Sequence, residues 1–309
     1  LGVPAAALVT TSTYRDTAYV PNSLNMAVSD FTINLPTSTG AIWYHMNWYT
    51  GGPTGSVYSV GMAFKDAAGN IAAQIAKNTA STMIFVAANG STYVSGANYT
   101  PPANTFVALD VKVSVGGSGG SITIEMYANG ILVSSATATN SGTVKTQPVT
   151  ITYANIGMRG TANYISEIIV AAGESTIGAR LAMLTPTSAG FYATMSGSVA
   201  GLADDDTATG VTANAAGQRF NTVMSAYGGP ASPTSIRGVY LKTFAQQSGA
   251  APTKLAHSLR IASTDYDAAD QTISSGVPIM TEWANNPNTG AAWVTAALSA
   301  LEAGLKSAT

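Results

Sequence analysis

Apolar and polar residues alternate at every second position through much of the first half of the chain. This period is typical of strands with one face in a core, because successive side chains point to opposite sides of a sheet. Over residues 42–49 the alternation assigns four side chains to the core face: Ile42, Tyr44, Met46 and Trp48. It assigns four others to the outward face: Trp43, His45, Asn47 and Tyr49. Further strand-like runs occupy residues 58–64, 109–115, 122–126, 131–135, 149–153 and 165–171.

Turn residues separate these runs. The Asn129-Gly130 pair is a strong signal for a two-residue hairpin, because both residues tolerate the left-handed backbone region. Two further turns, at residues 66–70 and 116–120, are built from Gly, Asp, Asn and small residues. Many short strands joined by such turns predict an antiparallel β-sandwich.

The pattern loosens over residues 173–189 and then resumes, with strand-like runs at 217–223, 236–244, 255–262 and 277–283. Near the C-terminus four apolar residues recur at helical spacing, Val294, Leu298, Leu301 and Leu305, and Gly304 lies where such a helix would stop. The sequence therefore predicts an all-β protein with two antiparallel β-sandwich (jelly-roll) domains and one short C-terminal helix. The predicted domains are residues 1–172 and 190–309, joined by a connector at 173–189.

Charged residues make up only 9% of the chain, and the formal net charge is −2. No stretch approaches the ~20 consecutive apolar residues that cross a bilayer. The 13 Lys and Arg residues form no basic run, which excludes a nucleic-acid footprint. Without cysteine there is no disulfide and no thiolate zinc site. Because the chain begins with Leu1 rather than methionine, we expect a processed or truncated N-terminus.

Residues 121–137 read SITIEMYANGILVSSAT, two strand-like runs around the Asn-Gly turn. This segment, together with the later run at residues 165–171, resembles the hairpins of laminin-G and concanavalin-like sandwiches. The resemblance implies a jelly roll of that kind for the first domain.

The C-terminal part carries a more specific pattern. Residues 263–274 read STDYDAADQTIS, and residues 281–307 read TEWANNPNTGAAWVTAALSALEAGLKS. This stretch resembles a family of tailed-phage and prophage virion proteins at the following positions: Trp283, Asn286, Pro287, Thr289, Gly290, Trp293 and residues 302–304. With residues 204–220 included, the resemblance covers roughly residues 160–309. It implies a structural role in the virion, and therefore a location in the phage particle.

The same motif predicts a local structure. Pro287 and Gly290 favour a tight turn, and Trp283 and Trp293 flank it. We expect both Trp rings to pack beneath the short helix. Val294 stands where the family usually has a helix-capping Thr, so Thr295 could take over the cap.

Motifs for catalysis are absent from the sequence. There are only two histidines, and His257 lies on an apolar face with Leu255 and Leu259, which favours a core histidine. The acidic residues of the first half are isolated, and no strand carries the E-x-D-x-E pattern of concanavalin-like glucanases. We therefore expect no enzymatic activity, with a polysaccharide depolymerase as a remote alternative.

Two acidic clusters could supply oxygen ligands to Ca²⁺: Asp204, Asp205 and Asp206, and Asp265, Asp267 and Asp270. Neither matches an EF-hand loop. We favour the interpretation that these side chains cap turns by bonding their own backbone, so no cofactor is predicted.

The candidate binding surface is the outward face of residues 42–49, formed by Trp43, His45, Asn47 and Tyr49. Flat aromatic rings beside an amide and an imidazole suit either a subunit interface or a sugar site. A shift of one residue in the register would place Trp43 in the core instead. The runs at 149–153 and 165–171 carry one charge between them, Glu167, and we expect them to be weakly guarded sheet edges that neighbouring subunits cover.

Together these features predict a non-enzymatic structural protein of a phage virion, in a capsid or a tail appendage. Its expected partners are copies of itself, with a trimer favoured, and other virion proteins. The alternative is a carbohydrate-binding adhesin that recognises glycans of the host surface.

Overall fold

A computed structural model describes residues 8–9, 23–25, 31–50, 59–77, 83–89, 92–153, 163–203, 208–229, 233, 235–250, 252–273, 276–299 and 301–309. The chain divides into two compact units, Leu1–Leu181 and Ala182–Thr309, called the first and second units below. This division falls inside the predicted connector at 173–189. Strands dominate the described residues, and the two helices found among them have four residues each. None of the helices in this part of the chain is long and apolar enough to span a membrane.

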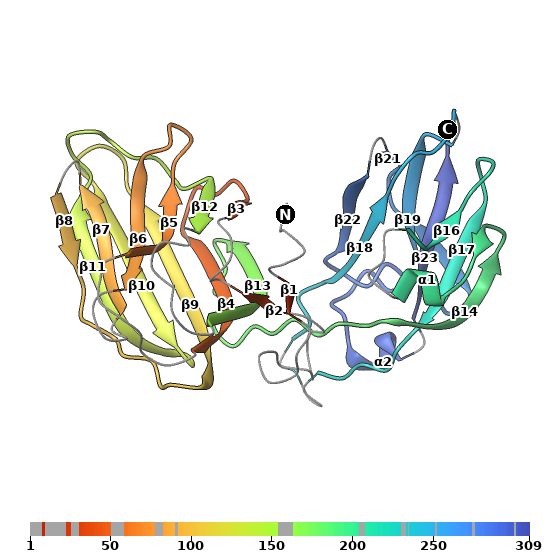
Figure 1. Ribbon diagram of the computed structural model, residues 1–309, viewed down its shortest axis with the longest axis horizontal. Helices are drawn as coiled ribbons and strands as arrows, with labels where there is room; N and C mark the ends of the chain where they lie inside the picture. The colour runs from red at the N-terminus through yellow and green to blue at the C-terminus, as the bar shows by residue number, and fades with distance from the viewer. Residues whose placement is uncertain are drawn as a thin grey trace. The chain divides into compact units, whose positions relative to one another are not determined.

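The first unit consists of two antiparallel sheets that face one another (Figure 1). One sheet has the spatial order β1 (Leu8–Val9), β2 (Ser23–Asn25), β13 (Asn163–Ala172), β4 (Ile42–Thr50), β9 (Thr105–Val115), β10 (Ser121–Ala128), β11 (Ile131–Thr139). The other has the order β3 (Phe31–Asn34), β12 (Thr150–Tyr153), β5 (Ser59–Lys65), β6 (Ile71–Lys77), β7 (Met83–Asn89), β8 (Thr92–Ser95). The predicted all-β sandwich is therefore confirmed.

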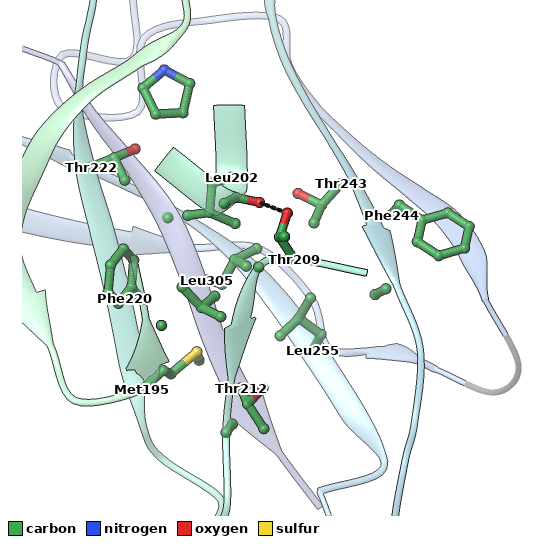
Figure 2. A pocket seen from close by; sticks show the side chains of 18 of the residues that line it. Met195, Leu202, Thr209, Thr212, Phe220, Thr222, Thr243, Phe244, Leu255 and Leu305 are labelled. Carbon is green, nitrogen blue, oxygen red and sulfur yellow. Dashed lines mark hydrogen bonds between the residues drawn. The ribbon is translucent and has the colours of Figure 1, made fainter. Parts of the chain in front are cut away.

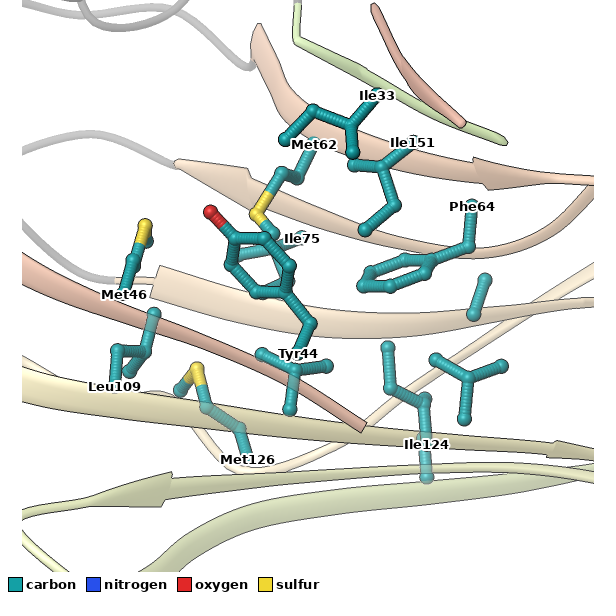
Figure 3. Packing of buried hydrophobic residues seen from close by; sticks show 14 of the residues in the cluster. Ile33, Tyr44, Met46, Met62, Phe64, Ile75, Leu109, Ile124, Met126 and Ile151 are labelled. Carbon is teal, nitrogen blue, oxygen red and sulfur yellow. The ribbon is translucent and has the colours of Figure 1, made fainter. Parts of the chain in front are cut away.

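Side chains from both sheets of the first unit meet in one apolar core (Figure 3). Tyr44 of β4 packs edge-on against Phe64 of β5, with ring centroids 6.5 Å apart, and both are fully buried. The predicted core face of residues 42–49 is confirmed, because Ile42, Tyr44, Met46 and Trp48 are at most 2% exposed. A core with so little exposed surface fixes the register of β4, since a slip of one residue would exchange its two faces.

The predicted Asn-Gly hairpin joins β10 to β11. Asn129 and Gly130 have φ of 49° and 81°, the left-handed values that a two-residue turn of this kind requires. Ala128 pairs with Ile131 directly across the turn.

Of the two runs predicted as open sheet edges, residues 149–153 lie inside a sheet, because β12 is paired along its length with β3 on one side and β5 on the other. For β12 the expectation was wrong, since a low charge content is also what a strand with neighbours on both sides needs. Strand β13 pairs with β4 over most of its length, but in the described structure β2 pairs only with its Tyr164 and Ile165. For the rest of that run the expectation stays a prediction.

The second unit has one main antiparallel sheet in the order β14 (Pro186–Ala193), β17 (Arg219–Met224), β23 (Glu302–Ala308), β19 (Lys254–Ile261), β20 (Thr264–Asp267), with β21 (Gln271–Thr272) also pairing with β19. Two small two-stranded sheets complete it: β18 (Val239–Ala245) with β22 (Val277–Trp283), and β15 (Ser196–Gly197) with β16 (Val211–Thr212). The helices are α1 (Ala200–Ala203) and α2 (Thr295–Leu298). Apolar side chains of the main sheet pack against the β18–β22 pair and both helices.

His257 lies in this second core on β19, as its apolar neighbours in the sequence predict. It is fully buried, and each ring nitrogen has a threonine hydroxyl within hydrogen-bond distance, Thr281 at 2.8 Å and Thr243 at 3.1 Å. Burial lowers the pKa of His257 to about 4, which keeps the ring neutral at physiological pH.

The predicted C-terminal helix is much shorter than the spacing of apolar residues indicates. Helix α2 ends at Leu298, and Leu305 lies on strand β23 in the middle of the main sheet. Leu301, Ala303 and Leu305 also alternate with a period of two, so the same residues serve a strand between two partners. Gly304 is required there, because a Cβ at this position would overlap Phe220 O and Asn221 Oδ1 on the neighbouring strand. Val294 precedes the helix without a side-chain cap, and Thr295 is already its first residue.

The Trp motif forms a tight loop that closes beneath this helix. Gly290 has a φ of 71°, and its N–H donates to Asn286 O at 2.8 Å. Trp293 is 3% exposed and packs with Leu298 and Leu301, while Trp283 lies half-buried at the edge of the same cluster. The Trp293 indole N–H donates to Trp283 O at 2.7 Å, so the two ends of the motif are joined directly.

Replacing Trp293 tests the contribution of this motif to stability. Because the ring is buried, Trp293→Ala should lower the free energy of unfolding of the second unit by about 3–5 kcal/mol. Val294→Ala is the matched control, since Val294 is 59% exposed, and it should change stability by less than about 0.5 kcal/mol. Equal urea midpoints for the two variants would contradict this packing.

Candidate functional site

The predicted outward face of β4 is buried rather than exposed. Trp43, His45 and Asn47 are 8%, 0% and 5% exposed. Tyr49 is half-buried, with its ring edge-on to Phe106 at 5.1 Å between centroids. The expectation that this face is open to a subunit or a sugar was therefore wrong.

The cover is the chain segment 173–181, which belongs to the predicted connector and packs on the first unit. Its Thr176 hydroxyl donates to Asp110 Oδ1 at 2.7 Å, and His45 Nδ1 lies 2.9 Å from the same oxygen. The Arg180 guanidinium donates to both carboxylate oxygens of Glu167, at 2.6 and 2.7 Å. A segment expected to link two domains thus pairs the polar groups of an outer sheet face.

Beyond this cover, the rim of the same face is an aromatic and ionic cluster. The rings of Trp43 and Tyr127 are 5.7 Å apart, and Lys112 Nζ lies 5.7 Å from the Trp43 ring. Lys112 also donates to Glu125 at 2.9 Å. Each of these side chains contacts another of the same cluster. The cluster therefore covers this part of the sheet face and does not expose it to a ligand.

The pairing of Glu167 with Arg180 can be tested by removing the cation. The Glu167 side chain is fully buried, so Arg180→Met leaves a buried carboxylate without its counter-ion and should destabilise the first unit by about 3 kcal/mol. Lys112→Met, which breaks a partly exposed pair, should cost less than about 1 kcal/mol. Thermal unfolding of both variants distinguishes the two, and equal losses would contradict a structural role for the cover.

The outer face of the main sheet of the second unit carries a different arrangement. Strand β14 pairs with β17 at Ala189–Thr222 and again at Ala193–Phe220, so three residues of β14 bulge out opposite Asn221 alone. We call residues 190–192 the bulge. Bulges redirect side chains and are frequent beside binding and catalytic sites.

Contacts with the sheet hold the bulge in place. A Cβ on Gly190 would come within 2.5 Å of Glu302 Oε2 and 3.0 Å of the Asn221 backbone, so glycine fits this close approach. The Phe191 N–H donates to Glu302 Oε2 at 2.8 Å. Asn221 lies below the bulge, fully buried, and neither of its side-chain amide atoms has a hydrogen-bond partner in the described structure.

The bulge presents an exposed aromatic ring on a cationic support. Phe191 is 65% exposed, although the Arg260 guanidinium lies only 4.0 Å from its ring centroid. Tyr192 meets Phe191 edge-on at 4.8 Å, and Arg219 lies 5.3 Å from the Tyr192 ring. Because these contacts restrict the Phe191 side chain, little conformational entropy remains to be lost when something binds to the ring.

Two aspartates connect the arginines beneath the rings. Asp265 accepts hydrogen bonds from the Tyr192 hydroxyl at 2.7 Å and from Arg260 at 2.6 Å. Asp267 accepts two from Arg219, at 2.8 and 2.5 Å, and one from Lys306 at 2.9 Å. Burial opposes ionisation of Asp267, but the hydrogen bonds from Arg219, Lys306 and Ser258 outweigh it and lower the pKa to about 2.

The acidic cluster of Asp265, Asp267 and Asp270 was a weak candidate for calcium binding and was expected to cap turns instead. The partners of Asp265 and Asp267 are side-chain cations. Asp265 and Asp267 already hold arginine and lysine groups in the places that a calcium ion would need, and Asp270 is exposed. In the ranges that the structure describes, no cluster of three or more His, Cys, Asp or Glu side chains could hold a metal ion. Asp204, Asp205 and Asp206 lie outside the described residues.

On its inner side, the same sheet borders a groove of about 1120 Å³ with a mixed polar and apolar lining (Figure 2). Met195, Phe220, Leu255 and Leu305 are among the residues of its floor, and threonine hydroxyls line its walls. The described lining of the groove contains neither a carboxylate nor a histidine, and therefore no acid–base pair for hydrolysis.

Comparison with known proteins adds little to this description. No family model matches the chain, and no curated protein matches it. Solved structures align with part of it: the receptor binding domain of botulinum neurotoxin D (10% identity, 54% of this chain and 44% of that chain, TM-score 0.37), a tetrameric galectin from Cinachyrella sp. (11%, 47% and 99%, 0.33) and a SAP-like pentraxin from Limulus polyphemus (11%, 48% and 77%, 0.26). The chain spans less than half the length of the botulinum domain. The fold class, two antiparallel β-sandwich units, rests on the sheets themselves.

Proposed function

We propose that this protein is a non-catalytic carbohydrate-binding protein whose sugar site is the bulge on the second unit. The observation that carries the proposal is Phe191, a largely exposed ring with one face packed on Arg260. Exposed aromatic rings give flat apolar contact to the C–H face of a sugar, while hydroxyl groups around the ring of the sugar require hydrogen-bond donors and acceptors. The bulge and the side chains beneath it supply both: Phe191 gives the ring, and the pairs Tyr192–Asp265 and Lys306–Asp267 give the hydrogen-bonding groups.

The state of the acids supports binding without hydrolysis. A glycosidase needs one carboxylic acid that keeps its proton near neutral pH, usually through a raised pKa. Here the pKa of Asp265 is lowered, because the hydrogen bonds from Tyr192 and Arg260 outweigh the effect of burial. Asp267 is ionised in the same way. Both carboxylates can therefore accept hydrogen bonds from hydroxyl groups but have no proton to donate.

Removing the Phe191 ring tests the site directly. In Phe191→Ala, affinity for any bound oligosaccharide should fall at least tenfold, as is usual when a stacking ring is lost. Phe244→Ala is the matched control, because Phe244 is 48% exposed elsewhere on the second unit and should leave affinity unchanged. Glycan-array binding followed by calorimetry on the hits provides the measurement. Unchanged affinity in Phe191→Ala would contradict the proposed site.

A second candidate function is a structural role in a phage virion, with the protein located in the particle. An exposed apolar face on β18 and β22 favours it. Tyr240, Phe244 and Met280 are 49%, 48% and 61% exposed there, on a two-stranded sheet. The same face carries Lys242 and Glu282, so two copies related by a two-fold axis could pair these opposite charges. The two strands have seven residues each, so their exposed face has a smaller area than the ~800 Å² per partner of a stable interface. A single homo-oligomeric contact through this face would be weak, and it would hold only in an assembly with many such contacts.

Sedimentation at rising concentration tests this second candidate. The unmodified protein should self-associate weakly, and Met280→Lys should abolish the association by placing two charges against each other. Val294→Lys changes an equally exposed residue away from this face and should have no effect. A protein that stays monomeric up to millimolar concentration would contradict the assembly role of the face.

A further inference from the structure

The bulge site has a charge distribution that bears on which sugars it accepts. Its charged residue types are three basic and three acidic: Arg219, Arg260, Lys306, Asp265, Asp267 and Glu302. The formal charge of this set is therefore zero. A site without net charge gives no long-range attraction to an acidic ligand.

The cations are also already engaged. Arg260 holds Asp265, and both Arg219 and Lys306 hold Asp267. The side chains of Arg260 and Arg219 are 12% and 17% exposed, and the Phe191 ring covers the Arg260 guanidinium. Because each arginine is largely covered and already holds an aspartate, a ligand carboxylate that approached it would place two carboxylates close to one cation.

Glu302 strengthens this barrier at the edge of the ring. Its Oε2 accepts a hydrogen bond from the Phe191 N–H, so a negative charge lies beside the backbone of the residue on which the sugar would stack. An acidic group on a sugar stacked over Phe191 would meet this charge. Like charges brought together at an interface are unfavourable by several kcal/mol.

Neutral sugars meet no such obstacle. A hydroxyl can donate to a free lone pair of Asp265 or Asp267 and accept from the Lys306 ammonium, whose side chain is 34% exposed, without breaking an ion pair. A carboxylate at Lys306 would instead lie beside Asp267, which the same ammonium already holds. We infer that the bulge site selects neutral glycans and discriminates against acidic ones, an inference that rests on the proposed carbohydrate-binding function.

Matched pairs of oligosaccharides test this selectivity. Each pair consists of a neutral oligosaccharide and the same molecule oxidised at C6 to the uronic acid, measured with the full chain at 0.05 and 0.5 M NaCl. We expect the neutral member to bind at least tenfold more tightly at low salt, and its affinity to change less than twofold between the two salt concentrations. Phe191→Ala should remove this binding.

Two variants address the cause of the selectivity. Asp267→Asn frees Arg219 and Lys306, and should raise the affinity for the acidic member at least tenfold. Circular dichroism shows whether Asp267→Asn folds. If it does not, Glu302→Gln takes its place: it removes the negative charge beside Phe191 and should narrow the difference in affinity between the neutral and the acidic member of a pair.

The outcomes separate the inference from the function on which it rests. Equal or tighter binding of the acidic member, lost in Phe191→Ala, would overturn the selectivity and leave the carbohydrate site standing. No binding of any pair, or neutral binding that Phe191→Ala leaves intact, would overturn the proposed site and the inference with it.

Discussion

The constraint that shapes both units is the cost of removing an ionised side chain from water. A buried carboxylate is tolerated only when a cation or several hydrogen bonds replace its hydration. Glu167 in the first unit is fully buried, whereas Asp267 in the second unit keeps 25% of its side chain exposed; each lies on an outer sheet face, and each is held by an arginine. In both units a short irregular segment crosses that face: residues 173–181 in the first, and the bulge at 190–192 in the second.

The two coverings have opposite consequences. In the first unit the segment brings Thr176 and Arg180 onto the sheet, where Thr176 shares Asp110 with the buried His45, while Tyr127 and Lys112 pack on Trp43 beside it. In the second unit the bulge adds aromatic rings above the ion pairs, and Phe191 remains largely exposed because its inner face alone packs on Arg260. The first arrangement completes a fold. The second builds a rigid surface, which is why the proposed binding site lies there.

The sequence predicts the local parts of this structure well. The alternation through Tyr44 and Met46 and the Asn129-Gly130 turn depend on neighbours in the chain, and both are confirmed. The prediction of a long C-terminal helix was wrong because Leu301 and Leu305 fit a helical and a strand period equally. The pairing of β23 with two strands decides between the two structures. Long-range pairing of this kind leaves no local signal.

The candidate site was missed for the same reason. Phe191 and Tyr192 look like an ordinary aromatic pair in the sequence, and their position follows from the mismatch between β14 and β17, which only the paired strands reveal. The aspartates were noticed as weak calcium candidates but interpreted as turn caps, because their partners Arg219 and Arg260 lie far from them or on another strand. Likewise, the burial of His45 depends on Thr176, 131 positions later in the chain, by way of Asp110. The sequence holds one local signal for the bulge: Gly190 stands directly before the aromatic pair Phe191 and Tyr192, next to a stretch in which the strand alternation is weak.

The most direct test of the central claim is a crystal structure of the full chain with a neutral oligosaccharide that it binds. The sugar should lie on the outer face of the Phe191 ring, with hydroxyl groups within hydrogen-bond distance of Asp265, Asp267 or Lys306, and with the Arg260 stack unchanged. A sugar bound elsewhere on the protein, with the Phe191 ring in contact only with solvent, would contradict it.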